Sequence, residues 1–249
     1  MMTTMALMRV SELFGPTFQG EGPSTGKLAL FLRLAGCNLD CAWCDTPYSW
    51  DWTRFDPETE VEAMSGDRVL RELAAKWAGV GQVARLDPHV VVTGGEPILQ
   101  ASRICELVMA RPSWSWEIET NGTRPVPLWL HGQAGLMVQV NVSPKLASSG
   151  CSPDRAAMHD SWAVLAHQRF GAGRRPVVFK FVVAGDEDVA GVRAWLDEFD
   201  VPRQLVYLMP EGETFNQAAY VFAADAALGL GVNLTGRLHT LVWPKERGR

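Results

Sequence analysis

Cys37-Asn38-Leu39-Asp40-Cys41-Ala42-Trp43-Cys44 sets three cysteines at a C-x3-C-x2-C spacing directly after an apolar run. Thiolates are soft ligands that suit iron–sulfur clusters and zinc. Three thiolates on one short loop can hold a cubic cluster of four irons and leave one iron open to a further ligand. Such an open iron is typical of a catalytic cluster rather than an electron-transfer cluster.

Two other interpretations of these cysteines are a structural zinc site and buried packing without metal. A structural zinc ion takes four protein ligands. No fourth candidate is near in the sequence, since the nearest histidine is His89 and both Cys105 and Cys151 belong to other segments. Packing cysteines are not expected on a loop rich in Gly, Asn and Asp, so the pattern favours the cluster. Cys105 falls on the apolar stripe of an expected helix and is interpreted as packing, and Cys151, on a polar loop, as free.

Outward from this loop, strand-like and helix-like segments alternate along the chain. The run 28–34 predicts a buried strand, and a helical stripe begins at Asp67. This alternation indicates a mostly parallel sheet with helices packed outside it. We expect an α/β fold with a single domain over residues 1–249. Its architecture would be a partial, TIM-like barrel of about six mostly parallel strands with outer helices, short of the eight strands of a closed barrel. Further strands are expected at 89–93, 116–119, 136–140, 177–183 and 204–209, short terminal ones at 232–234 and 239–243, and further helices at 98–110, 156–167, 188–199 and 215–228.

Polar and glycine-rich clusters come directly after the expected strands. Examples are 36–46 after the first strand, 94–97 after the second and 119–122 at the end of the third. Ligands of parallel α/β proteins bind at the carboxyl ends of the strands. The sequence therefore predicts that one end of the sheet collects the chemistry.

Composition excludes some classes of protein. The net charge of −5 gives no basic field for nucleic acid, and 47% hydrophobic residues is ordinary for a globular chain. No apolar run approaches the roughly 20 residues of a membrane span, and residues 1–10 do not resemble a signal peptide. The tight cysteine group fits a reducing compartment. We expect a cytoplasmic protein without a nucleic-acid or membrane partner.

Gly94-Gly95-Glu96-Pro97 adds a second motif to the cysteine loop. The two motifs together resemble the radical S-adenosylmethionine (SAM) superfamily. The resemblance implies that SAM chelates the open iron through its amino and carboxylate groups. It also implies that the glycine-rich segment offers backbone groups to the SAM amino group, because glycine permits close backbone approach.

Four further stretches narrow the resemblance to the 7-carboxy-7-deazaguanine synthase family, over about residues 11–243. They read FGPTFQGEGP at 14–23, CDT at 44–46, ETNGT at 119–123 and SPK at 143–145. The resemblance implies ring contraction of 6-carboxy-5,6,7,8-tetrahydropterin with loss of ammonia, in queuosine and 7-deazapurine biosynthesis. It implies a 4Fe–4S cluster, SAM that is regenerated, and Mg2+. It also implies a homodimer and an unidentified reductant such as flavodoxin.

The resemblance assigns roles residue by residue. Cys37, Cys41 and Cys44 would hold the cluster, and Thr46 would be the Mg2+ ligand. Arg33 would bind the substrate carboxylate with its planar fork. The other substrate-binding residues that it implies are Phe18, Gln19, Gly20 and Thr93, and the SAM-binding residues are Gly95, Glu96, Ser143, Lys145, Met209, Pro210, Glu211 and Gly212.

Some residues keep two interpretations. Arg33 could form an ordinary surface ion pair, although its apolar strand neighbours disfavour this. Glu119 could act at the site or serve as a structural hydrogen-bonding residue. Lys180 interrupts an apolar strand, and an unpaired buried lysine is costly, so we expect it to meet a carboxylate or the site. Core packing is expected for Trp77, Trp162 and Trp195.

The alternative function is a radical SAM activase, which makes a glycyl radical on a partner protein. Activases share the compact fold and the cysteine spacing, but they have no reason to keep the F-Q-G-E-G and C-D-T stretches. A non-catalytic zinc or iron–sulfur interaction protein is a third class. It would leave the glycines and the arginine at the strand ends unexplained.

Overall fold

One open sheet organises the computed structural model, which describes residues 6–84, 86–130, 138–168 and 177–248. The strands of the sheet are β1 (Leu7–Phe18), β2 (Leu28–Leu34), β3 (Glu62–Ser65), β4 (His89–Gly94), β5 (Ser115–Thr120), β6 (Val138–Val142), β7 (Val177–Val183), β8 (Val206–Pro210) and β9 (Asn233–Leu234). Their order is β3-β1-β2-β4-β5-β6-β7-β8-β9. All neighbours from β2 to β9 pair in parallel, whereas β1 is antiparallel to β2 and β3.

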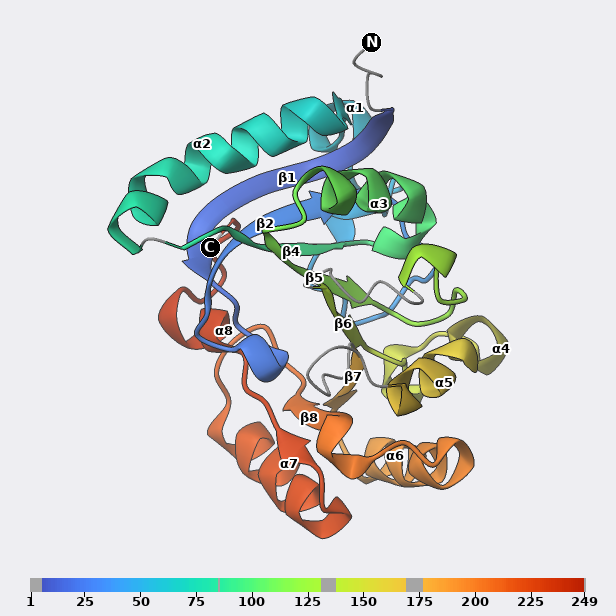
Figure 1. The fold of residues 1–249 in the computed structure, drawn as a ribbon. Coiled ribbons are helices and arrows are strands. Elements are labelled where there is room, and N and C mark those ends of the chain that lie inside the picture. Colours follow the sequence, from blue (N-terminus) through green and yellow to red (C-terminus); the bar gives the residue numbers. More distant parts are fainter. Residues whose placement is uncertain (1–5, 85, 131–137, 169–176, 249) are drawn as a thin grey trace.

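Helices connect the parallel strands and lie along the outside of the curved sheet (Figure 1). They are α1 (Pro57–Glu60), α2 (Gly66–Ala84), α3 (Ala101–Ala110), α4 (Pro153–Ala156), α5 (Ser161–His167), α6 (Asp186–Phe199), α7 (Gln217–Leu230) and α8 (Leu238–Val242). Local sequence explains where they begin and end. In α7, for example, the Asn216 side chain accepts hydrogen bonds from the first backbone amides, and Gly231 ends the helix in the left-handed conformation.

The expected α/β class, with a mostly parallel open sheet and outer helices, is confirmed, but the expected number of about six strands is wrong. The six expected strands correspond to β2, β4, β5, β6, β7 and β8. The antiparallel strands β1 and β3 were not expected. Strand β1 is half-buried for much of its length and contains Gly15-Pro16, which reads as a turn, and its register with β2 shifts twice.

The expected strand at 239–243 is also wrong, because α8 covers most of it. A helical turn forms there, with the Thr240 hydroxyl donating to Arg237 O at 2.7 Å. The expected helix at 156–167 is broken into α4 and α5, with residues 157–160 between them. Residues 136–137 of the expected strand 136–140 lie outside the described residues.

The core is built on β7, whose seven residues are all buried, including Lys180. Trp195 of α6 packs against Phe179 and Phe181 of this strand, with ring centroids 4.8 and 5.0 Å apart. Trp77, Trp162 and Trp195 are all buried, so their expected core positions are confirmed. A strand buried on both faces is what a parallel sheet covered by helices requires.

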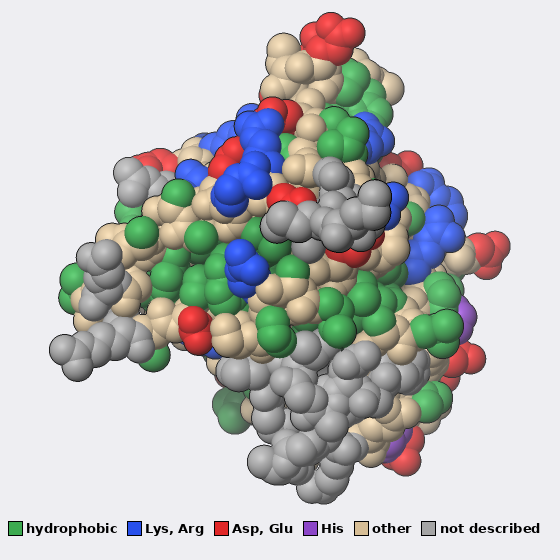
Figure 2. Space-filling model, turned by 45° about the horizontal axis from the view of Figure 1, so that its top comes forward, with side chains coloured by type: hydrophobic (Ala, Val, Ile, Leu, Met, Phe, Trp, Pro, Cys, Tyr) green, Lys and Arg blue, Asp and Glu red, His purple; other side chains and the backbone are tan. Residues whose placement is uncertain are grey.

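The surface shows no field of one sign on the face drawn in Figure 2, where basic, acidic and apolar side chains are interspersed. In the described ranges, no helix is long and apolar enough to cross a membrane.

Candidate functional site

The carboxyl ends of the parallel strands surround a hollow of about 920 Å3, part of which is open to solvent. Its walls contain residues that lie on, or directly after, the six parallel strands β2, β4, β5, β6, β7 and β8. The expectation that one end of the sheet collects the unusual residues is therefore confirmed. The hollow brings together Cys37, Cys41, Cys44, Thr46, Thr93, Gly95, Ser143, Lys145, Met209, Glu211 and Gly212 of the expected set.

A second hollow of about 690 Å3 adjoins the first. It collects the expected substrate residues, which are Phe18, Gln19, Gly20, Arg33 and Thr93. The two hollows share Glu21, Asp45, Thr46, Thr93, Gly94 and Glu119, so they form one continuous site. Glu96 and Pro210 are not among the residues that line either hollow.

The three cysteines of the cysteine loop line the first hollow. The indole of Trp50 donates to Cys44 Sγ at 3.2 Å, and the Leu39 amide donates to Cys37 Sγ at 3.4 Å. Burial raises the pKa of Cys37 to about 11 and that of Cys41 to about 12. A metal would take the place of those protons, because a coordinating thiol is deprotonated.

The donor set fits an iron–sulfur cluster better than a single ion. In the described part of the chain, no three or more His, Cys, Asp or Glu side chains converge closely enough to hold one metal ion. A cubane is larger than an ion and takes one thiolate at each of three corners, so its ligands need not converge on a point. Three thiols on the wall of one hollow suit that geometry.

Gly94 and Gly95 allow the end of β4 to lie against the start of the cysteine loop. A Cβ on Gly94 would lie 2.0 Å from Leu34 O, and one on Gly95 would lie 2.1 Å from Gly36 O. The backbone is tied there by Gly95 N donating to Leu34 O at 3.1 Å and Glu96 N to Gly36 O at 2.8 Å. Both glycines are therefore required by backbone packing, whatever ligand lies beside them.

Glu96 has a structural environment. Its carboxylate is buried and accepts hydrogen bonds from Ile98 N at 2.8 Å, Thr120 Oγ1 at 2.8 Å and Asn121 N at 2.7 Å. These bonds tie the end of β4 to the end of β5. The expected contact of Glu96 with SAM stays a prediction.

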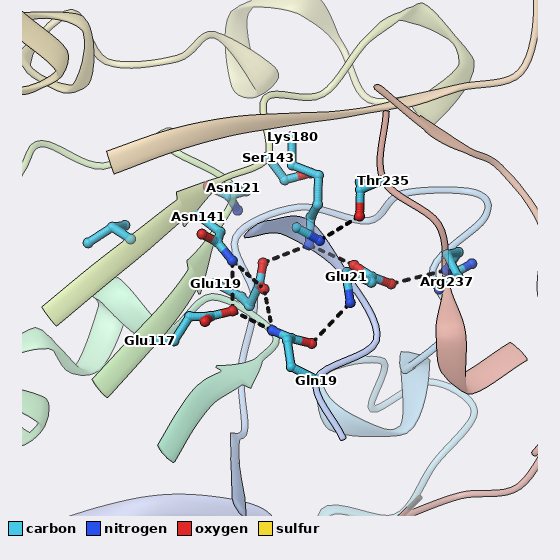
Figure 3. A network of polar contacts seen from close by, with 12 residues as sticks. Gln19, Glu21, Glu117, Glu119, Asn121, Asn141, Ser143, Lys180, Thr235 and Arg237 are labelled. Atoms are coloured by element: carbon cyan, nitrogen blue, oxygen red, sulfur yellow. Dashed lines mark hydrogen bonds and ion pairs between the residues drawn. The ribbon is translucent and has the colours of Figure 1, made fainter. Parts of the chain in front are cut away.

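A buried polar network forms the floor of the site (Figure 3). The side-chain amide of Gln19 donates to Glu117 and, at 3.1 Å, to Glu119. Asn141 donates to the same two carboxylates at 2.8 and 3.0 Å. Gln19 Oε1 accepts from the Glu21 amide at 3.3 Å. The orientation of the Gln19 amide is therefore set by its surroundings.

Lys180 belongs to this network and lines the first hollow, so the expectation that it meets a carboxylate or the site is confirmed. Its Nζ is 2.6 Å from Glu21 and 2.8 Å from Glu119. Burial alone would raise the pKa of Glu21, but Lys180 and Arg237 bring it well below its usual value. For Glu119 the effect of burial is the largest, and it raises the pKa of this carboxyl. Lys180 lowers the pKa but does not cancel that effect, and repulsion from Glu117 raises the pKa further.

The C-terminal segment contributes residues that the sequence did not indicate. Arg237 donates to Glu21 at 3.1 Å, to Gly212 O at 2.5 Å and to Asp45. His239 lines the second hollow, and burial lowers its pKa. A Cβ on Gly20 would lie 2.2 Å from His239 Nδ1, so the two segments are in close contact.

Arg33 lines the second hollow and forms an ion pair, so features of both interpretations are present. Its Nε donates to Glu12 at 2.7 Å, and its guanidinium lies 5.5 Å from the Phe14 ring centroid. The pair is largely buried, unlike an ordinary surface pair. Its proposed contact with a substrate carboxylate stays a prediction.

Cys151 is a free cysteine, as expected, but its environment is not that of an exposed polar loop. It is buried, and its Sγ lies 3.6 Å from Cys41 Sγ. Cys105, expected as packing, is only half-buried on α3. The contact between Cys41 and Cys151 could not be predicted from spacing, because the two residues are 110 positions apart. The only signal for it in the sequence was the presence of cysteines beyond the three of the loop.

Comparison with known proteins gives consistent matches. A family model described as a 4Fe-4S single cluster domain matches residues 18–115. The 7-carboxy-7-deazaguanine synthase of Pyrobaculum aerophilum is 34% identical over 256 residues and covers 100% of both chains. That of Hyperthermus butylicus is 34% identical, over 95% of this chain and 93% of its own. The crystal structure of QueE from Escherichia coli has a TM-score of 0.63 at 25% identity, over 94% of this chain and 95% of that one.

A relationship over the full length of both chains accounts for the cysteine loop, the strand-end motifs and the sheet together, and the resemblance noted in the sequence is confirmed. The chain belongs to the 7-carboxy-7-deazaguanine synthase family of radical SAM lyases.

Proposed function

We propose that the chain catalyses the radical SAM- and Mg2+-dependent ring contraction of 6-carboxy-5,6,7,8-tetrahydropterin to 7-carboxy-7-deazaguanine, with loss of ammonia. The observation that supports this most is the pair of joined hollows. One hollow is lined by three cysteines, and the other by the polar groups of the FQGE turn. This product class would serve queuosine or 7-deazapurine biosynthesis.

The first hollow supplies the groups that the cofactors need. Cys37, Cys41 and Cys44 would hold the 4Fe–4S cluster. Lys145 carries the positive charge that suits the carboxylate of SAM, and its Nζ is steadied by Ser143 Oγ at 2.9 Å and by the Trp43 ring, 5.2 Å from the centroid. When bound, the cluster and SAM supply the one-electron chemistry that removes a hydrogen atom from the substrate.

The second hollow has the groups for a carboxylated pterin. A 2-aminopyrimidinone edge carries adjacent N–H donors, and a carboxylate such as Glu119 can accept two of them. The Gln19 side chain, held between Glu117 and the Glu21 amide, would orient that edge. Arg33 would bind the substrate carboxylate at the other end of the ring system.

Thr46 lines both hollows and is the proposed Mg2+ ligand. Its hydroxyl is 3.9 Å from Cys44 Sγ, which puts it next to the cluster loop and the substrate residues at once. Mg2+ takes oxygen ligands and keeps several waters, so one protein hydroxyl together with substrate oxygens suffices.

The test is an assay of product formation. Protein whose cluster is reconstituted without oxygen is mixed with the carboxylated tetrahydropterin, SAM, Mg2+ and dithionite. We expect 7-carboxy-7-deazaguanine and ammonia in equal amounts, with SAM not consumed. Cys44→Ser should give no product, whereas Cys105→Ser, on α3 away from both hollows, should match the wild type.

Lack of the deazaguanine product with an intact, reducible cluster would contradict the proposal. SAM cleavage together with a glycyl radical on a partner protein would instead support the activase.

A further inference from the structure

Cys151 lies beside a cluster cysteine although 110 residues separate them in the chain. It sits between the 3-10 turn Ala147–Ser149 and α4. Its Sγ is 3.6 Å from Cys41 Sγ, and its side chain packs with Leu39 and Ala156 in a small apolar cluster against the cysteine loop. Nothing in the proposed reaction uses this thiol.

Contacts on either side of the thiol pair hold its two segments together. Ala42 N donates to Ser149 O at 2.9 Å. Arg155 of α4 reaches back to the cysteine loop, where it donates to Asp40 at 3.1 Å and to Asn38 O at 2.9 Å. The two sulfurs are thus kept close by the fold before any bond joins them.

The other cluster cysteines have different neighbours. Cys44 Sγ accepts from the Trp50 indole and Cys37 Sγ from the Leu39 amide. A disulfide bond measures about 2.05 Å, so Cys41 and Cys151 would need to approach by about 1.5 Å from their 3.6 Å separation. A change of side-chain torsion angles can supply that movement.

We propose that Cys41 and Cys151 form a reversible disulfide in the cluster-free protein. The oxidant is a peroxide. One thiol is oxidised to a sulfenic acid while the peroxide releases water, and the second sulfur then displaces the hydroxyl as a second water. The two sulfurs lose two electrons and two protons, and hydrogen peroxide is reduced to two waters. A dithiol reductant reopens the bond by thiol–disulfide exchange.

The disulfide would couple cluster loading to redox conditions. In the loaded protein Cys41 is bound to iron and cannot form it. In the cluster-free protein the bond removes one of three iron ligands, and it keeps Cys41 from irreversible oxidation to the sulfinic acid. The proposed disulfide rests on the short distance between the two sulfurs, and it does not depend on SAM or on the pterin.

The first experiment uses the full-length, cluster-free protein. It is exposed to a small excess of hydrogen peroxide, thiols are counted after denaturation, and peptides are mapped by mass spectrometry. We expect loss of two of the five thiols and a Cys41–Cys151 linked peptide that dithiothreitol removes. The matched control Cys105→Ser should form the same link. A different linked pair, or a Cys151 that remains a thiol, would overturn the proposal.

The second experiment measures iron binding, without SAM or substrate. Oxidised wild-type protein should take up little iron until dithiothreitol is added and should then recover fully. Cys151→Ser should load iron and sulfide normally when it has never met peroxide. After peroxide and then dithiothreitol, it should recover less iron than the wild type. Equal recovery, or loss of iron from untreated Cys151→Ser, would contradict the protective role. Failure of the ring-contraction assay would leave both readouts unaffected.

Discussion

Gly95 shows how a single absent Cβ positions the cysteine loop. The structure gives Gly95 a role in backbone packing, since a Cβ would lie 2.1 Å from Gly36 O and 2.9 Å from Cys37 N. Backbone atoms cannot move aside as a flexible side chain can. The position of the loop that contains Cys37 is therefore set by β4 as much as by its own sequence.

Gly95→Ala should destabilise the protein by about 1–3 kcal/mol, the range for overpacking a close contact. We also expect lower iron content, because Cys37 follows the displaced Gly36. Urea unfolding and iron analysis measure these effects. The control is Gly79→Ala on the exposed face of α2, where nothing lies within 4 Å of the new Cβ. It should be neutral or stabilising by about 0.5–1 kcal/mol. Equal behaviour of the two variants would contradict the packing role.

Thr46 allows a test of the metal assignment at one hydroxyl. Thr46→Ala removes the oxygen that we propose for Mg2+, whereas Thr46→Ser keeps it. We expect Thr46→Ala to lose most of the stimulation of turnover by Mg2+ and to keep the iron content of the wild type. Thr46→Ser should keep both. Rates measured over a range of Mg2+ concentrations decide this, and full stimulation of Thr46→Ala would remove Thr46 from the metal site.

Strand β7 carries a charge in the middle of the core, and its neighbours stabilise that charge. Lys180 pairs with Glu21 and Glu119. Its pKa is raised, because the two carboxylates outweigh the effect of burial. Removing one partner of such a group leaves uncompensated buried charge, which costs about 3–5 kcal/mol. Lys180→Met should therefore be strongly destabilising near neutral pH.

The pH dependence gives this prediction a sign. Lys180 stabilises fully below its ordinary pKa of 10.5 and loses this as the pH rises through its higher folded value. Glu21 stabilises above its ordinary 4.5 and loses this as the pH falls through its lower folded value. Glu119 has a raised folded pKa, so its contribution to stability falls as the pH rises, which offsets part of the stabilisation by Glu21. Between those two ordinary values the contributions of Lys180 and Glu21 stay constant, and among these three groups only that of Glu119 should fall as the pH rises above 4.5.

In Lys180→Met the effect of Glu119 becomes larger, because Glu119 then lacks its cation and its folded pKa rises further. Protonation favours the folded state, so stability should increase from pH 8 to pH 5 in urea unfolding. Arg103→Met, which breaks the exposed pair with Glu106 on α3, should change stability by less than about 1 kcal/mol at either pH. A variant as stable as the wild type at pH 8 would show that the network contributes little.

At the level of elements, the sequence predicted what depends on local pattern. The apolar runs of β4 and β7 and the motifs after each parallel strand follow from spacing alone, as does the convergence of those motifs at one end of the sheet. Strand β1 was not predicted, because many of its residues are half-buried and Gly15-Pro16 interrupts the alternating pattern.

The contacts of Arg237 and Cys151 were not predicted for another reason. Each joins segments that are far apart in the chain, and only the folded sheet brings them together.

Across the whole molecule, the C-terminal segment closes the open sheet over the site. Leu238 N donates to Gly20 O at 2.9 Å, and the Trp243 ring stacks on Phe18 with centroids 6.4 Å apart. Arg247 reaches Glu12 on β1 and lies 3.7 Å from the Tyr48 ring centroid. The C-terminal segment thus lies against β1 and the turn that follows it.

Arg237 connects the C-terminal segment to the walls of both hollows, because it contacts Glu21, Asp45 and Gly212 together. We infer that it is a positioning residue. Arg237→Ala should release the Gln19–Glu21 turn and raise the KM for the pterin by about tenfold or more, which corresponds to about 1.4 kcal/mol. The iron content should change much less. Arg237→Lys should restore little of the affinity for the pterin, since the single nitrogen of an ammonium cannot span three partners as a planar fork does.

The control Arg203→Ala removes an arginine that donates to Leu230 O away from the site and should leave the KM for the pterin unchanged. A lower kcat at constant KM would contradict the positioning role, because the turn would then bind substrate equally well without Arg237.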